Sequence, residues 1–122
     1  MLKDSLYIIK TIAVEKNSVE ALIEVNAQHE IFKGHFPSQP VLPGACVLQI
    51  IKEIIKTALD IKLQLVKADE IKFLQMIQPA GDDIQFSVQY DFTGNSSLKL
   101  SAKITVNTVV CCKMKAAFQV KN

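Results

Sequence analysis

The stretch IFKGHFPSQPVLPGACVLQIIKE, Ile31 to Glu53, joins a stiff loop directly to a helix. Prolines fix φ and push the preceding residue towards extended geometry, and three of them fall within seven residues of this loop: Pro37, Pro40 and Pro43. Gly34 permits a close backbone approach just before His35. Such rigidity favours either a preorganised site around one imidazole or a stiff connection whose histidine bonds the backbone.

The segment from Pro43 to about Leu59 predicts a helix, because proline suits a first turn where its missing N–H has no partner. Nearly all of its side chains are apolar or small. The polar positions form one narrow stripe: Gln49, Lys52, Glu53, Lys56 and Asp60. This pattern is typical of a helix that is buried over most of its circumference.

The rest of the chain alternates between apolar and polar residues, which predicts strands. A hairpin turns at Asn17-Ser18, between strands at Tyr7–Glu15 and Val19–Val25. The other predicted strands are Leu65–Ile77, which is long enough to bend, Ile84–Phe92, Leu98–Val106 and Val109–Val120. A flat sheet would leave most of the apolar surface of this helix exposed to water. We therefore expect an α+β fold in which a curved antiparallel sheet of five to six strands wraps one long central helix.

Composition limits the classes of protein. The 122 residues are 49% hydrophobic but contain no apolar run of the roughly 20 residues that span a membrane. The N-terminal MLKDSLYIIK lacks a signal-peptide layout, so we predict a cytoplasmic protein. A formal charge of +2 argues against nucleic-acid binding. The apolar excess and the sheet edges predict a dimer.

Neither a metal nor a cofactor is implied by the sequence. The three cysteines, Cys46, Cys111 and Cys112, lack the spacing of a metal site, and we interpret them as reduced structural thiols. Cys111 and Cys112, as neighbours on a strand, should point to opposite faces.

The helix start favours carbonyl chemistry. The N–H groups of Gly44 and Ala45 have no partner within the helix and lie at its positive end. A thioester or carbonyl oxygen placed there would have its developing negative charge stabilised. Gly44 carries no Cβ, so a substrate can approach its N–H closely.

The motif HEIFKGHFPSQPVLPG, His29 to Gly44, resembles the signature of the bacterial 3-hydroxyacyl-(acyl carrier protein) dehydratases of the hotdog fold. Lys72-Phe73 and Pro79-Ala80-Gly81-Asp82 resemble a second patch of that family, and the likeness runs from about Asn17 to Val120. The resemblance implies one hotdog domain over residues 1–122. It also implies that His35 is the base for the α-proton, that the Gly44 N–H polarises the thioester carbonyl, and that a helix carboxylate comes from the other subunit.

This chain departs from the family at that carboxylate. The matching residue is Gln49, and the family's usual glutamine, four residues later, is Glu53 here. An amide can orient water or a hydroxyl but cannot donate a proton as an acid does. We predict that Gln49 positions the hydroxyl or water. Glu53 could replace the acid, but our preferred interpretation places it in a solvated stripe with Lys52 and Lys56.

Other residues have predicted supporting roles. His29 is expected to hydrogen-bond within the loop, and Phe32 and Phe36 to line the substrate tunnel or pack in the core. If an acyl carrier protein delivers the acyl thioester, it would meet only lysines, such as Lys33, Lys67 or Lys72, because the chain has no arginine.

Three alternatives stay open from the sequence. The chain could be an acyl thioesterase, because the same fold supports hydrolysis. It could be the half-catalytic subunit of a heterodimeric dehydratase in which a partner supplies glutamate, in place of a homodimer or higher oligomer. It could also be a purely structural protein.

Overall fold

A computed structural model describes residues 1–33, 41–79 and 81–121 of the chain. Six strands and one long helix follow one another, with a short 3-10 helix, η1, before the long one. Their bounds are β1 Tyr7–Val14, β2 Ser18–Val25, η1 Glu30–Phe32, α1 Gly44–Leu59, β3 Lys62–Phe73, β4 Ile84–Phe92, β5 Ser97–Val106 and β6 Val109–Lys121. All of these strands form one antiparallel sheet in the order β1-β2-β4-β5-β6-β3.

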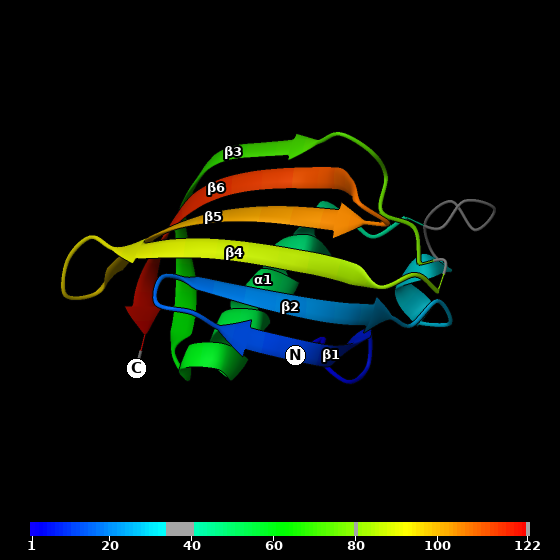
Figure 1. Ribbon diagram of the computed structural model, residues 1–122, viewed down its shortest axis with the longest axis horizontal. Helices are drawn as coiled ribbons and strands as arrows, with labels where there is room; N and C mark the ends of the chain where they lie inside the picture. The colour runs from blue at the N-terminus through cyan, green and yellow to red at the C-terminus, as the bar shows by residue number, and fades with distance from the viewer. Residues whose placement is uncertain (34–40, 80, 122) are drawn as a thin grey trace.

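The sheet curls around α1, as Figure 1 shows, so that the helix lies against one face and the other face is open. The apolar side of α1 supplies much of the core through Val47, Ile50, Ile51, Ile54 and Ile55, all of which are buried. The sheet supplies the other side of the core, because buried and exposed side chains alternate along its strands. In β5, every second residue from Leu98 to Ile104 is buried. This is the predicted hotdog arrangement, and the predicted class of fold is confirmed.

The helix begins and ends where local chemistry requires. Pro43 is the N-cap residue, with extended backbone (φ −64°, ψ 149°), and its ring fixes this φ. At the other end Asp60 adopts the left-handed conformation (φ 56°), and its N–H bonds the Lys56 carbonyl at 2.9 Å. The predicted helix from Pro43 to Leu59 is therefore confirmed to within one residue.

Strand β3 differs from its prediction. It begins three residues earlier, at Lys62, and ends at Phe73, because the N–H groups of Leu74 and Gln75 both turn to the Cys111 carbonyl. Its register against β6 shifts twice, after Leu65 and after Ala68. Such bulges bend a strand, which agrees with the predicted bend.

A bulge also corrects the prediction for the cysteines. Cys111 and Cys112 are both buried, whereas strict alternation would expose one of them. Ile104 pairs with Cys112 and Thr105 with Val110, so Cys111 is the extra residue of a β-bulge. Cys46 is also buried, all three thiols are unpaired, and burial raises the pKa of Cys46 and Cys112.

The two sheet edges differ in character. β1 forms one edge and the longer β3 forms the other (Figure 1). Exposed apolar side chains gather on β3 and on the segment that follows it: Val66, Ile71, Phe73, Leu74 and Met76. Within the described ranges, no helix is long and apolar enough to cross a membrane.

Candidate active site

The start of α1 presents two backbone donors at an exposed position. The N–H groups of Cys46 and Val47 already bond the Pro43 carbonyl, at 3.0 and 3.1 Å. No described residue accepts a hydrogen bond from the N–H of Gly44 or Ala45, and both residues are exposed. These two groups therefore offer the helix dipole and two unused donors to an incoming oxygen.

The ring of Phe73, at the end of β3, stands over this helix start. A Cβ added to Gly44 would lie 3.1 Å from Cζ and 3.3 Å from Cε2 of Phe73, which is tighter than ordinary contact. Glycine at this position therefore preserves a narrow gap between the ring and the helix backbone. A flat acyl or thioester group could reach the Gly44 N–H through such a gap.

Further along α1, the Glu53 carboxylate is surrounded by hydrogen-bond donors. Its side chain is 2% exposed. Oε1 accepts from the N–H of Lys3 at 2.7 Å and from the Tyr7 hydroxyl at 3.0 Å. Oε2 accepts from the N–H of Leu2 at 2.9 Å and from Gln49 Nε2 at 2.8 Å. Both oxygens are therefore fully engaged inside the protein.

These contacts decide the protonation states of Glu53 and Tyr7. Burial by itself would raise the pKa of Glu53, but the hydrogen bonds from Leu2, Gln49, Lys3 and Tyr7 together outweigh it and lower the pKa. Glu53 is thus an ionised carboxylate at neutral pH. Burial, with the adjacent Glu53 charge, raises the pKa of Tyr7, which keeps its hydroxyl protonated as a donor.

The solvated-stripe interpretation of Glu53 is wrong. Lys56 is exposed and Lys52 is half-buried, but Glu53 turns inward to bind the N-terminal segment. Sequence reasoning also missed Tyr7 and the backbone of Leu2 and Lys3. The available signal was a single acidic residue within an apolar helix, since a buried carboxylate requires several donors.

Glu53 also fixes the orientation of Gln49. An ionised carboxylate only accepts hydrogen bonds, so the amide nitrogen of Gln49, and not its oxygen, must face Glu53. The one side-chain hydrogen bond of Gln49 to a described residue is this one, so no described residue donates to its Oε1. With respect to residues 1–33, 41–79 and 81–121, the half-buried Gln49 therefore keeps its acceptor oxygen for a hydrogen bond from a hydroxyl group or water.

The other predicted residues divide into three groups. His29 caps η1, and its Nδ1 accepts from the N–H of Ile31 at 3.1 Å, so its predicted loop role is confirmed. Phe32 is buried in the core cluster. His35 and Phe36 lie outside the described residues, as does most of the proline loop.

The lysines named for a carrier protein are dispersed. Lys33 is exposed beside η1, while Lys67 and Lys72 lie on β3. Lys67 pairs with Asp69 at 3.5 Å, and Lys72 pairs with Glu70 at 3.2 Å.

A curved antiparallel sheet wrapped around one buried helix, with free amides where that helix begins, defines a protein of the hotdog fold. Residues 11–115 match the model of the ApeI-like family, described as ApeI dehydratase. The chain belongs to this dehydratase family.

Curated relatives support the same class. The 3-hydroxyacyl-[acyl-carrier-protein] dehydratase FabZ of Chlamydia caviae is 25% identical over 114 residues, which cover 86% of this chain and 73% of that protein. The enzyme of the same name from Coxiella burnetii is 26% identical over 119 residues, covering 88% and 83%. The predicted resemblance to the 3-hydroxyacyl-carrier-protein dehydratases is thus confirmed.

Solved structures share the fold. A chain of the dehydratase heterocomplex ApeI:P from Xenorhabdus doucetiae superposes with a TM-score of 0.78 and 18% identity, covering 92% of this chain and 96% of that one. A hypothetical thioesterase from Streptococcus pneumoniae, solved with coenzyme A, has a TM-score of 0.67 and 13% identity, covering 98% and 92%. At these identities the likeness concerns the fold alone.

Proposed function

We propose that this protein dehydrates 3-hydroxyacyl thioesters to 2-enoyl thioesters, with an acyl carrier protein as the carrier. Membership of a dehydratase family supports the class of reaction. Within the chain, the proposal rests on the exposed helix start. There the N–H groups of Gly44 and Ala45, beside Phe73, can donate hydrogen bonds to a substrate oxygen.

The reaction divides among a few groups. The thioester oxygen accepts from the Gly44 N–H, which stabilises the enolate that forms when the α-proton leaves. His35 takes that proton, because imidazole is the usual base near neutral pH. The bond between the β-carbon and its hydroxyl then breaks. The imidazolium returns the proton to the departing hydroxyl, and water leaves.

Gln49 and Glu53 have different roles in this scheme. The Oε1 of Gln49 accepts a hydrogen bond from the substrate hydroxyl or from the departing water and so holds it in place. Glu53 does not donate a proton, because all of its contacts are with donors. It acts as a positioning residue that turns the Gln49 amide, and Phe32 supports the site from the core.

The test is the formation of a 2-enoyl thioester from a 3-hydroxyacyl thioester, followed by ultraviolet absorbance. The wild-type protein should produce the enoyl band and His35→Ala should not. A thiol reagent in a parallel assay detects hydrolysis. If both proteins give a flat trace and the wild type releases free thiol, the protein is a thioesterase and the proposal fails.

A second candidate is a subunit of a heterodimeric dehydratase. Gln49 in place of an acid favours it, and the structural relative from Xenorhabdus doucetiae belongs to a dehydratase heterocomplex. In that case a partner would supply a helix glutamate opposite His35 of this chain. Activity that appears only when a second, glutamate-bearing hotdog chain is added would establish this candidate.

We also propose that the β3 edge forms the subunit interface. This edge is unpaired among the described strands (Figure 1). Exposed apolar side chains gather on it. Strand pairing with a second hotdog chain would satisfy the free backbone groups and cover those side chains.

A further inference from the structure

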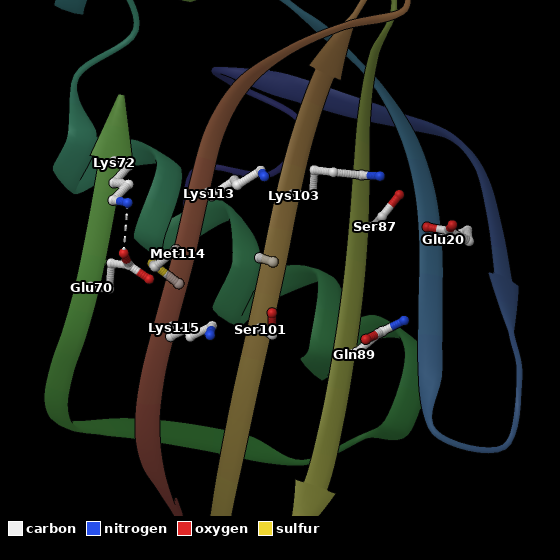
Figure 2. Close-up of a pocket in the computed structure, with 11 residues that line it drawn as sticks. Glu20, Glu70, Lys72, Ser87, Gln89, Ser101, Lys103, Lys113, Met114 and Lys115 are labelled. Carbon is white, nitrogen blue, oxygen red and sulfur yellow. Dashed lines mark ion pairs between the residues drawn. The ribbon is translucent and has the colours of Figure 1, made fainter. Parts of the chain in front are cut away.

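The face of the sheet that points away from α1 carries three lysines at one level of adjacent strands. Lys103 of β5 is the register partner of Lys113 of β6, which is in turn the partner of Lys72 of β3. Figure 2 shows these three residues side by side, with α1 behind the sheet. All three are exposed, and we call them the lysine row.

Like charges directly opposite one another destabilise a sheet. Lys72 is compensated by Glu70 at 3.2 Å, but no carboxylate in the described part of the chain pairs with Lys103 or Lys113. The row borders a hollow of about 520 Å³ that Lys115 also lines. Because no described carboxylate offsets the repulsion between Lys103 and Lys113, a negatively charged partner would do so.

The charge pattern across the row has a direction. On the β4 side Lys103 is paired with Ser87, and Ser87 is paired with Glu20 of β2. The line therefore begins with one carboxylate, passes a hydroxyl and ends in three cations (Figure 2). Two copies of this face would bring lysines against lysines, so a second copy of the chain fits poorly.

We propose that the lysine row docks an acidic α-helix of a partner protein that lies across β5, β6 and β3. Neighbouring strands are about 4.8 Å apart, and one helical turn rises about 5.4 Å. Carboxylates on three successive turns of one helix face therefore meet the three lysines in order. Charge complementarity over this span selects an acidic helix whose glutamates or aspartates recur every three to four residues.

A helical protein surface fits this face better than a small anion. The chain has no arginine, so no bidentate fork is available to grip a phosphate. The lysines are exposed point charges distributed along a line, and they do not converge on one buried position. Such a surface gives steering and orientation more than tight binding.

The row ends one residue away from Phe73, on the opposite face of the sheet from the candidate active site. Lys72 and Phe73 are consecutive in β3 and therefore point to opposite faces of the sheet. Phe73 stands over Gly44, while Lys72 ends the row on the outer face. A protein held by the row would thus lie on the outer face of β3, and a substrate attached to it would have to pass the end of β3 to reach the helix start. If the proposed function holds, this partner is the acyl carrier protein; only that identity rests on the proposed function.

The probe is a labelled helical peptide with glutamate on three successive turns of one face, and fluorescence anisotropy measures its binding. Its control is the same peptide with glutamine at those positions. The variant is Lys103→Gln with Lys113→Gln. The matched control variant is Lys62→Gln with Lys121→Gln, which removes another cross-strand lysine pair, at the far end of β3 and β6.

The row variant should weaken binding by about fivefold, since an exposed ion pair contributes about 0.2–1 kcal/mol. The Lys62/Lys121 variant is the control for the loss of two lysines, and the glutamine peptide is the control for binding without negative charge. Binding of the glutamate peptide should fall with added salt. Equal losses in both lysine variants would overturn the proposal. Displacement of the peptide by inorganic phosphate at similar concentration would also overturn it, in favour of a free-anion site.

Activity assays separate this inference from the proposed function. With a short soluble thioester the row variant should turn over like the wild type, because the row does not touch the helix start. With a carrier-bound substrate its KM should rise and its kcat should stay unchanged. If the row variant matches the wild type with both substrates, the acyl carrier protein is not the partner. If the protein binds the glutamate peptide but shows no activity with either substrate, the docking surface stands and the proposed function is wrong.

Discussion

Gln49 donates a 2.8 Å hydrogen bond from Nε2 to Oε2 of Glu53, one helical turn further along α1. The same carboxylate accepts from the N–H groups of Leu2 and Lys3. One buried charge therefore ties the beginning of the chain to the central helix and determines which end of the Gln49 amide remains free. In this polar network the Glu53 carboxylate fixes the orientation of the Gln49 amide, and the Gln49 N–H helps to hold the carboxylate ionised.

The first prediction concerns stability. Gln49→Glu places two carboxylates together and should lower the free energy of unfolding by about 2 kcal/mol. Glu53→Gln leaves the Leu2, Lys3 and Tyr7 donors without their charged acceptor and should cost a similar amount. The double exchange restores one donor and one acceptor, so the two losses should not add. Urea unfolding of all four proteins gives the coupling energy, expected at about 1–2 kcal/mol. Strict additivity would show that the two side chains act independently.

The second prediction concerns turnover of the doubly exchanged protein. Exchange of the two residues brings a carboxylic acid to position 49, where the proposed reaction lacks a proton donor. General acid catalysis contributes about 100-fold or more when it is well placed, so dehydration should accelerate by at least about tenfold. The enoyl absorbance assay measures this rate. A doubly exchanged protein that folds normally but is no faster would place Gln49 away from the reacting hydroxyl.

The third prediction is a dependence of stability on pH. The folded pKa of Glu53 lies below its unfolded value of about 4.3. Glu53 therefore stabilises the fold above about pH 4.3, and this contribution is lost as the pH falls through the folded pKa. Thermal unfolding between pH 7 and pH 3 should show a steeper loss for the wild type than for Glu53→Gln. Glu15→Gln, which removes an exposed carboxylate, should keep the wild-type slope.

The fourth prediction concerns the gap at the helix start. Gly44→Ala brings a Cβ within 3.1 Å of the Phe73 ring, which must shift by a few tenths of an ångström. The ring is 49% exposed and can move, so the melting temperature should change little. Access to the Gly44 N–H should narrow, and the rate with thioester substrate should fall about tenfold or more, as when an oxyanion donor is impaired. Addition of Phe73→Leu should restore part of the rate; if it restores none, the ring is not the obstacle.

The fifth prediction tests the subunit interface. Ile71→Lys on β3 should convert the assembly to monomers, because a lysine on a paired edge opposes strand addition. Ile8→Lys on β1 is its match, since Ile8 is 47% exposed and Ile71 is 45% exposed on the opposite edges of the sheet. Size-exclusion chromatography with light scattering measures both. Dissociation by Ile8→Lys alone would move the interface to β1.

The pattern of the chain was sufficient for the number and order of the strands and the long helix and for the class of fold, whereas the bounds of β3 differed from the prediction. The alternation in β5 and the apolar circumference of α1 each follow from a fixed period: side chains two residues apart on a strand, and three or four apart on a helix, share the face that packs in the core. Pro43 and the dipeptide turns mark where the elements begin and end. The family motif added the expectation of membership of a dehydratase family, which the comparisons confirmed.

Contacts between distant residues were beyond such reasoning. The spacing of Glu53 in the helix placed it wrongly in a solvated stripe, because three of the four donors that bury it lie 46 to 51 residues away, at Tyr7, Lys3 and Leu2. The bulge at Cys111 and the lysine row depend on which residues face one another across strands, and a shift by one residue changes all such pairs. Local periodicity therefore determined the elements, whereas the closing of the sheet around α1 decided which charges became buried and which stood together in water.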